Sequence, residues 1–488
     1  MFKKNLKISN AVLLICSILS INPLPVFSQS SNSDFSFKDL SAFKPVSKNW
    51  FVAGDVTFDL NDSKSVKTTK GQGILVNVNT EKERQDIFTV MEHGDAELDL
   101  DFMMAKNSNS GIYLQGRYEI QLLDSWGKKS LYFGDVGGIY ERWDESKPEG
   151  QKGYEGTAPR VNASKAPGLW QNIKITFVAP KFDDKGTKVS NAKIVRIILN
   201  DIPIIENIEL SGVTRGSAFK EEAPKGPLRI QGDHGIVAFR NFKVKPLTEA
   251  PEEKYPGRWG AANPIKVVAA KEPVIIRSFA DFKRPEEEKG TRISHAVSVG
   301  HPEEVGYTIN LKNGSLIQVW KGEFLDATPM WNSRGNGVSR PGGHKIMLNN
   351  QPIMARLSAP NAAWPDTLAS ENDFRSKGYE LDKAGIPTFK YSIHNINIED
   401  KFSIENEGRE LVRELKMEGA NKENLYILIA RGKEISSTAG GRYLINDKEY
   451  YLELSNVKPE IRTSNNSKEL LLPVSGLKNG TLQYKLIW

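Results

Sequence analysis

Cysteine and histidine are scarce in this chain of 488 residues, which contains one cysteine, Cys16, and six histidines. A single cysteine excludes an intramolecular disulfide framework, a thiolate zinc site and a Cys-x-x-Cys-His haem motif. Five of the histidines show no metal-ligand spacing, and phosphate-binding loops and Gly-x-Ser-x-Gly elbows are absent. We therefore expect no cofactor, although scattered acidic residues leave a divalent metal open.

Long hydrophobic runs are also absent, apart from one near the N-terminus. Three lysines precede an apolar stretch from Ala11 to Leu19, and small residues follow near Ser28. This pattern predicts a signal peptide over 1–28, because the apolar stretch is too short for a transmembrane helix. Lipid anchoring at Cys16 is disfavoured, since Ile15 is larger than a lipobox allows. We expect an exported protein, periplasmic or extracellular.

Charge of one sign does not dominate the sequence. The 66 basic and 60 acidic residues are interspersed, so the net charge of +6 comes without a basic stripe. Nucleic-acid binding needs such a concentration of positive charge. The charge pattern therefore argues against a nucleic-acid partner.

Alternation of apolar and polar residues is what the sequence has in abundance. Residues 96–102 alternate strictly, as expected of a half-buried strand. Residues 111–114 and 118–122 predict two strands joined by a tight turn, and further strands are predicted at 172–178, 193–199 and 236–244. Amphipathic helical patterns are scarce. The pattern predicts an all-β fold, either a sandwich or a jelly roll.

A polar, proline-marked segment divides the alternating blocks. We interpret residues 248–261 as a linker between a first domain over 36–247 and a second over 262–488. The second block again contains short strands and Asn-Gly turn signals, as at 313–314 and 479–480. It is predicted to form a second β-sandwich-like domain of unknown role.

The densest polar cluster lies between residues 107 and 143. On a strand through 118–122, Glu119 and Gln121 share one face, and the apolar residues between them must face the core. Carboxylates, amides and aromatic rings on one sheet face suit sugar binding. The alternative is a solvated outer face with ordinary cross-strand pairs. The candidate binding residues in this cluster are Asn109, Tyr113, Gln121, Tyr140 and Trp143.

A second cluster is formed by Gln231, Asp233 and His234, followed by a strand that carries Arg240. If that strand is straight, His234 and Arg240 share a face. Such groups can transfer protons or stabilise an enolate. The alternative is structural: Asp233 and His234 cap a turn, and Arg240 pairs with a carboxylate.

These clusters occur in an order that resembles the 3-keto-disaccharide hydrolase domain family. Asn109-Ser110-Gly111-Ile112, Tyr118-Glu119-Ile120-Gln121 with Asp124, Gly138-Ile139-Tyr140, Gly168-Leu169-Trp170, Gln231 with His234-Gly235, and Phe239-Arg240-Asn241 carry the resemblance. It spans about 210 residues. The sequence departs from the family pattern at Gly232, which is inserted before Asp233, and at Gln171, where the family often has Asn. These departures could reshape the site.

The resemblance implies a concanavalin A-like jelly roll that acts on glycosides oxidised to a ketone at carbon 3. The keto group acidifies the proton on carbon 2, so a base can remove it and the aglycone can leave by elimination or net hydrolysis. We hypothesise that Glu119 or Asp124 is the base, and that Arg240 or His234 stabilises the enolate or protonates the leaving group. Gln231 is a further candidate substrate-binding residue.

Two other function classes stay open. Lectins share this fold, so the chain could be a non-catalytic carbohydrate-binding protein. The second domain is similar to C-terminal modules found beside cytochrome c or sugar-oxidising domains, so the chain could instead be a scaffold for a sugar-oxidising oxidoreductase. For the enzyme and for the carbohydrate-binding protein, the resemblance implies an oligosaccharide or keto-glycoside as the ligand.

Overall fold

The computed structural model describes residues 33–247, 264–284, 288–331, 335–359, 361–454 and 457–488. Nearly all regular structure in these residues is β-strand, which confirms the all-β prediction. One short helix, α1 (Thr328–Trp331), and five 3₁₀ turns interrupt the strands. The turns are η1 (Glu371–Asp373), η2 (Asn406–Gly408), η3 (Ala439–Gly441), η4 (Val474–Gly476) and η5 (Lys478–Gly480). The predicted signal peptide, Cys16 and the predicted linker lie outside the described residues.

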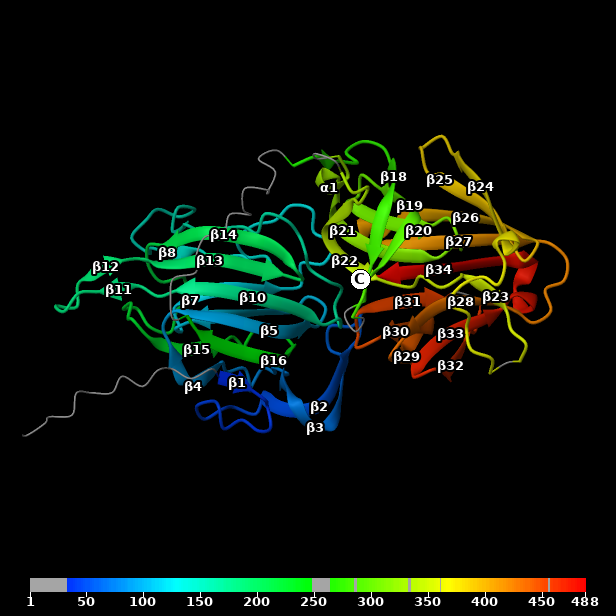
Figure 1. Cartoon of the computed structure of the whole chain (residues 1–488). Helices are drawn as coiled ribbons and strands as arrows, with labels where there is room; N and C mark the ends of the chain where they lie inside the picture. Colours follow the sequence, from blue (N-terminus) through cyan, green and yellow to red (C-terminus); the bar gives the residue numbers. More distant parts are fainter. Residues whose placement is uncertain (1–32, 248–263, 285–287, 332–334, 360, 455–456) are drawn as a thin grey trace, which may run out of the picture. The chain divides into compact units, whose positions relative to one another are not determined.

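The first part of the chain builds a large antiparallel sheet, several strands of which lie side by side in Figure 1. Its neighbouring strands, in spatial order, are β14 (Ile202–Leu210), β13 (Ala192–Leu199), β10 (Gln171–Val178), β5 (Ala96–Met104), β16 (Val237–Pro246), β3 (Val66–Asn77) and β2 (Trp50–Phe58). The eighth strand, β1 (Ser33–Phe35), pairs with β16. The strands predicted at 96–102, 172–178, 193–199 and 236–244 are confirmed as β5, β10, β13 and β16.

A smaller antiparallel sheet faces this one across an apolar core. Its strand order is β4 (Ile87–His93), β15 (Gly226–Ile230), β6 (Asn109–Leu114) and β7 (Tyr118–Leu123). Ile112, Ile120 and Ile230 of this sheet pack in one cluster with Leu98, Ile175 and Phe239 of the large sheet. The alternating residues between them therefore point away from the core, as alternation along strands requires.

The turn between β6 and β7 is as tight as the sequence predicts. Gln115 and Gly116 both adopt left-handed backbone angles, with φ of 54° and 67°. Such angles match the twist of a hairpin. The loops contain two further two-stranded ladders. One pairs β8 (Arg142–Trp143) with β9 (Gly153–Tyr154), and the other pairs β11 (Lys181–Phe182) with β12 (Lys188–Ser190).

The C-terminal region contains three antiparallel sheets. The six-stranded sheet holds β17 (Lys266–Val267), β21 (Leu316–Asp326), β20 (Val305–Asn310), β19 (Thr291–Gly300) and β18 (Val274–Phe282), with β22 (Arg340–Met347) on β21. The four-stranded sheet holds β23 (Met354–Arg356), β28 (Leu425–Gly432), β33 (Ser467–Pro473) and β32 (Glu460–Ser464). The eight-stranded sheet holds β24 (Phe374–Leu381), β25 (Pro387–Ile393), β26 (Ile396–Glu405), β27 (Glu410–Glu418), β34 (Thr481–Ile487), β31 (Tyr450–Leu454), β30 (Arg442–Ile445) and β29 (Ile435–Ser437).

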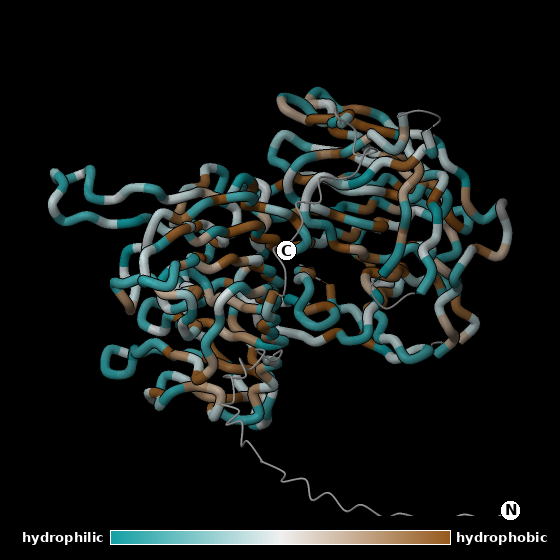
Figure 2. Tube along the Cα trace, turned by 60° about the vertical axis from the view of Figure 1, so that its left-hand side comes forward, coloured by the Kyte–Doolittle hydropathy of each residue, from teal (hydrophilic) through white to brown (hydrophobic). Residues whose placement is uncertain are grey.

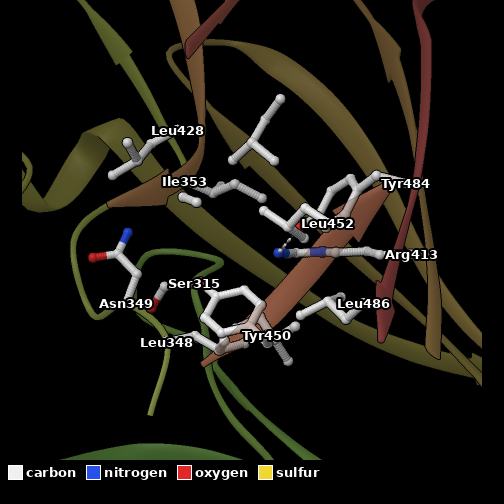
Figure 3. Close-up of a pocket in the computed structure, with 13 residues that line it drawn as sticks. Ser315, Leu348, Asn349, Ile353, Arg413, Leu428, Tyr450, Leu452, Tyr484 and Leu486 are labelled. Carbon is white, nitrogen blue, oxygen red and sulfur yellow. Dashed lines mark hydrogen bonds between the residues drawn. The ribbon is translucent and has the colours of Figure 1, made fainter. Parts of the chain in front are cut away.

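A buried ion pair lies in the core of the C-terminal region. Both Arg413 and Asp400 are almost fully buried, and the guanidinium binds both carboxylate oxygens at 3.0 and 2.6 Å. Arg413 also donates to the Tyr484 hydroxyl at 3.2 Å, beside a cavity of about 20 Å³ (Figure 3). Every charged atom thus has a partner, which a buried charge needs.

Hydrophobic residues gather inside the strand layers, while loops and hairpin tips are hydrophilic (Figure 2). Within the described residues, strands pair only inside 33–246 or inside 266–487. No further division into compact units separates the described residues from 33 to 488, so the division into domains 36–247 and 262–488 stays a prediction. No helix of the described residues is long and apolar enough to cross a membrane.

Candidate functional site

The outward face of the small sheet gathers most of the candidate residues. Tyr113 of β6 lies directly opposite Glu119 of β7 and opposite Arg229 of β15. Beyond β7, residues 137–140 continue the sheet, because Ile139 forms an antiparallel bridge with Ile120. Tyr140 therefore lies beside Glu119, and its amide donates to the Glu119 carbonyl at 3.1 Å. One row of side chains thus runs Arg229, Tyr113, Glu119, Tyr140.

Glu119 is the most unusual ionisable group in this row, because its side chain is almost completely buried. Burial raises the pKa of the Glu119 carboxyl to about 8, although a hydrogen bond from Tyr113 and the charge of Arg229 oppose this rise. The carboxyl lies over Gly111, where an added Cβ would approach its Oε1 to 2.5 Å. The missing side chain at Gly111 therefore makes the room that Glu119 occupies.

Tyr113 donates a hydrogen bond to the Glu119 carboxyl, and the charge of Arg229 acts on it. Burial, followed by the Glu119 charge, raises the pKa of the Tyr113 phenol, so this hydroxyl keeps its proton. The Arg229 guanidinium lies 4.2 Å from the Tyr113 ring centre and pairs with Asp86 at 2.5 Å. Asp86 thereby orients Arg229, because a paired guanidinium is held in a fixed plane.

A second row runs Gln231, Gly111 and Gln121 across the same face. The Gln121 amide donates to Asn109 Oδ1 at 2.7 Å, which joins two predicted binding residues. The backbone N–H of Gln231 donates a hydrogen bond to the backbone carbonyl of Gly111 at 2.9 Å. The side-chain Oε1 atoms of Gln121 and Gln231 are buried and have no hydrogen-bond partner. Both oxygens are therefore unsatisfied acceptors, which are rare in native structures.

His234 lies at the edge of this face. Its Nδ1 is 2.5 Å from Asp233 Oδ1 and 3.3 Å from the Gln231 amide nitrogen, and its side chain is more than half exposed. The Asp233 charge raises the pKa of Glu119, although burial is the larger cause. His234 therefore contacts Gln231, and its neighbour Asp233 lies close enough to Glu119 for its charge to act on that carboxyl.

Trp143, another predicted binding residue, lies on β8 and contacts Arg215. The Arg215 guanidinium stacks 3.6 Å from the Trp143 ring centre and pairs with Glu141 at 3.2 Å. Arg215 also acts on the hydroxyl of Tyr140, whose pKa is raised by burial and by Glu119. Tyr140 and Trp143 are thus connected through Arg215.

Asp124 has a different environment from Glu119. It follows β7, and its two oxygens accept the backbone amides of Asn107 at 2.9 Å and Trp126 at 3.3 Å. Burial raises the pKa of the Asp124 carboxyl, while these amides oppose the rise. These bonds hold the loop before β6 against the end of β7, which is a structural role.

Arg240 is separated from Glu119 by the sandwich itself. It lies on β16 of the large sheet, next to Phe239, which faces the core, so its side chain points to the outer face. There it bonds Asp101 at 3.3 Å and lies 4.1 Å from the Trp170 ring centre. His234 and Arg240 therefore do not share a face, contrary to the expectation for a straight strand. Arg240 instead pairs with the Asp101 carboxylate, as the structural alternative predicted.

Arg229, Asp86 and Gly111 belong to the site but are absent from the predicted set. A sequence signal exists for Arg229, since it alternates with apolar residues in Leu228-Arg229-Ile230-Gln231 and shares a face with Gln231. Gly111 belongs to the motif Asn109-Ser110-Gly111-Ile112 that carries the family resemblance, but the sequence alone indicates no role for it in the site. Within the described parts of the chain, no group of three or more His, Cys, Asp or Glu side chains is arranged to hold a metal ion.

A family model matches the first part of the chain. Residues 32–245 match the family model of the 3-keto-alpha-glucoside-1,2-lyase-like domain. The resemblance predicted from the sequence is therefore confirmed over these residues, and the match indicates a carbohydrate-active domain. No curated protein matches the chain.

Several solved structures are similar at low identity. Two crystal structures of candidate glycosyl hydrolases from Parabacteroides distasonis ATCC 8503 are 23% and 19% identical, with TM-scores of 0.31 and 0.30. Both cover 45% of this chain, and the alignments take in 84% and 100% of the respective structures. The carbohydrate binding module CBM66 from Bacillus subtilis is 9% identical over 41% of this chain and 96% of its own, with a TM-score of 0.20. These low scores carry no argument about function.

Proposed function

We propose that residues 33–247 cleave 3-keto-glycosides by elimination, with Glu119 as the base. The observation that carries this proposal is the buried Glu119 carboxyl, whose pKa is raised to about 8, within a row of hydrogen-bond donors. A raised pKa makes a carboxylate a stronger base near neutral pH. The match to a lyase-like family model supports the same chemistry.

The reaction begins at carbon 2 of the oxidised sugar. The Glu119 carboxylate takes the proton from carbon 2, and the electron pair moves onto the ketone oxygen at carbon 3 to give an enolate. The protonated Tyr113 phenol and the Arg229 guanidinium supply donors for that oxygen. When the ketone re-forms, a double bond forms between carbons 1 and 2 and the aglycone oxygen leaves carbon 1.

The leaving oxygen needs a proton, and His234 is the group proposed to give it. Its ring is held 2.5 Å from Asp233 Oδ1 at the edge of the same face. Gln121 and Gln231 are proposed to bind sugar hydroxyls through their unpartnered oxygens. Addition of water to the unsaturated product would give net hydrolysis. Arg229 replaces Arg240 in this scheme, because Arg240 lies on the other sheet.

The test uses a 3-keto-glucoside with a chromogenic leaving group, beside the unoxidised glucoside. We expect release from the keto sugar alone, and a loss of at least 100-fold in the Glu119→Gln variant, the scale of general base catalysis. Asp124→Asn is the matched control, because Asp124 is a half-buried carboxyl at the end of the same strand, and its hydrogen bonds go to backbone amides. Equal losses in both variants would remove Glu119 from the catalytic role.

Export and a sugar-oxidising partner are also part of the proposal. A 3-keto substrate requires an earlier oxidation of the hydroxyl at carbon 3, which an oxidoreductase must supply. The alternative function is sugar binding without cleavage, favoured by the two unpartnered amide oxygens. Binding of the keto sugar without release of the chromophore would favour that alternative.

A further inference from the structure

A row of aromatic rings leads away from Glu119 on the side opposite Arg229. Tyr140 lies beside Glu119, and its ring centre is 5.5 Å from that of Phe133. The Phe133 ring is in turn 5.4 Å from the Tyr132 ring. Both pairs are edge-to-face, which is a favourable arrangement for aromatic rings. The three rings therefore form one connected group, here called the aromatic row.

The backbone holds the aromatic row on the site face. Ile139 also bridges Thr157, so Gly156 lies beside Tyr140 in the same sheet. An added Cβ at Gly156 would approach Cγ of Phe133 to 2.5 Å, which places the Phe133 ring directly over this glycine. The ring of Phe133 thus continues the row that starts with Arg229, Tyr113 and Glu119.

The aromatic row is not fully covered by the protein. Tyr132 is 50% exposed, and Phe133 and Tyr140 are half-buried. Lys128 lies 5.1 Å from the centre of the Tyr132 ring and pairs with Asp135 at 2.6 Å. Aromatic side chains are common in the lining of sites that bind small ligands.

The two sides of Glu119 differ in chemistry. The side with Gln231 and Arg229 offers an amide and a guanidinium, which are groups that recognise sugar hydroxyls. The side with Tyr140, Phe133 and Tyr132 offers ring surface. A glycoside whose sugar occupies the polar side would extend its aglycone along the aromatic row.

We propose that the aromatic row is an aglycone subsite that selects glycosides with an aromatic aglycone. This inference rests on the proposed cleavage of 3-keto-glycosides at Glu119. An aromatic aglycone gains both apolar burial and ring–ring contacts there, whereas a second sugar stacks only its C–H faces on the rings and gains less.

The experiment compares two 3-keto-glucosides with the same linkage, one with a phenyl aglycone and one with a glucosyl aglycone. The variants are Tyr132→Ala and Phe133→Ala, and kcat/KM is measured for both substrates. We expect kcat/KM for the phenyl substrate to fall about 3- to 10-fold in each variant, the scale of one aromatic contact. The glucosyl substrate should change less than 2-fold.

Tyr154→Ala is the matched control, because Tyr154 is an aromatic residue of the same region that packs against Arg142 and Lys147. Circular dichroism establishes that each variant is folded, and Tyr132→Ala is the safer variant because its side chain is half exposed. Equal losses on both substrates, or no loss on either, would overturn the subsite. Failure of the wild-type protein to cleave either substrate would instead overturn the proposed function, and the subsite with it.

Discussion

Replacement of Glu119 by glutamine should change how stability depends on pH. In the folded protein, burial raises the pKa of Glu119 from an ordinary value of 4.5 to about 8. Between these two pH values the folded state holds a proton that the unfolded chain releases. Stability therefore falls as the pH rises from about 4.5 to 8, since the unfolded state then binds fewer protons than the folded one.

The magnitude follows from the same two values. Each pKa unit corresponds to about 1.4 kcal/mol, so the rise from 4.5 to about 8 corresponds to about 5 kcal/mol of lost stability at alkaline pH. Glutamine carries no charge and fits nearly the same space over Gly111. The wild-type protein should thus become less stable than Glu119→Gln as the pH rises from 4 to 9, by an amount approaching that value.

Urea denaturation at several pH values, followed by tryptophan fluorescence, measures this difference. Subtracting the wild-type free energy from that of the variant cancels the contribution of all other titrating groups. Glu206→Gln is the matched control, because Glu206 is an exposed carboxylate on β14 of the same region. The reasoning is refuted if the difference between wild type and Glu119→Gln is independent of pH, as expected for Glu206→Gln.

Three further predictions concern single residues. Gly111→Ala should lower kcat/KM at least tenfold while the protein stays folded, because the new Cβ would displace the Glu119 carboxyl; unchanged activity would contradict the proposed position of the base. Arg229→Met should move the ascending limb of the pH–rate profile to higher pH, because the Arg229 charge lowers the pKa of Glu119; a shift to lower pH would contradict this. Asp400→Asn should destabilise the protein by about 3–5 kcal/mol in urea denaturation, since it leaves the Arg413 charge buried and uncompensated; a loss below 1 kcal/mol would show that the pair is solvated.

Much of the site could be predicted from the sequence because strand alternation determines which face a residue is on. The spacing predicts that Glu119 and Gln121 share one face, and the structure places them there, with Tyr113 opposite Glu119. The same rule cannot tell which strands become neighbours. Arg240 follows His234 closely in the sequence, but its strand joins the other sheet, so the two side chains diverge.

The register between neighbouring strands is the second feature that could not be predicted from the sequence. Arg229 enters the site because β15 pairs with β6 so that Arg229 lies opposite Tyr113. A shift of one residue would send Arg229 into the core, because side chains alternate between the two faces. The role of Gly111 depends on the same register, since only the carboxyl above it explains why a side chain is missing there.

The pairing of Glu119 with Gly111 joins the proposed catalysis to stability in one local arrangement. Because Gly111 has no side chain, the Glu119 carboxyl can lie directly over it. There Tyr113 and its neighbours shield the carboxyl from water. That shielding raises the pKa of Glu119, and a higher pKa gives the carboxylate the basicity that removal of a carbon-bound proton demands. The same shielding makes ionisation unfavourable for folding. A variant that exposes the carboxyl should therefore gain stability at alkaline pH and lose its strength as a base, and the two effects should scale together.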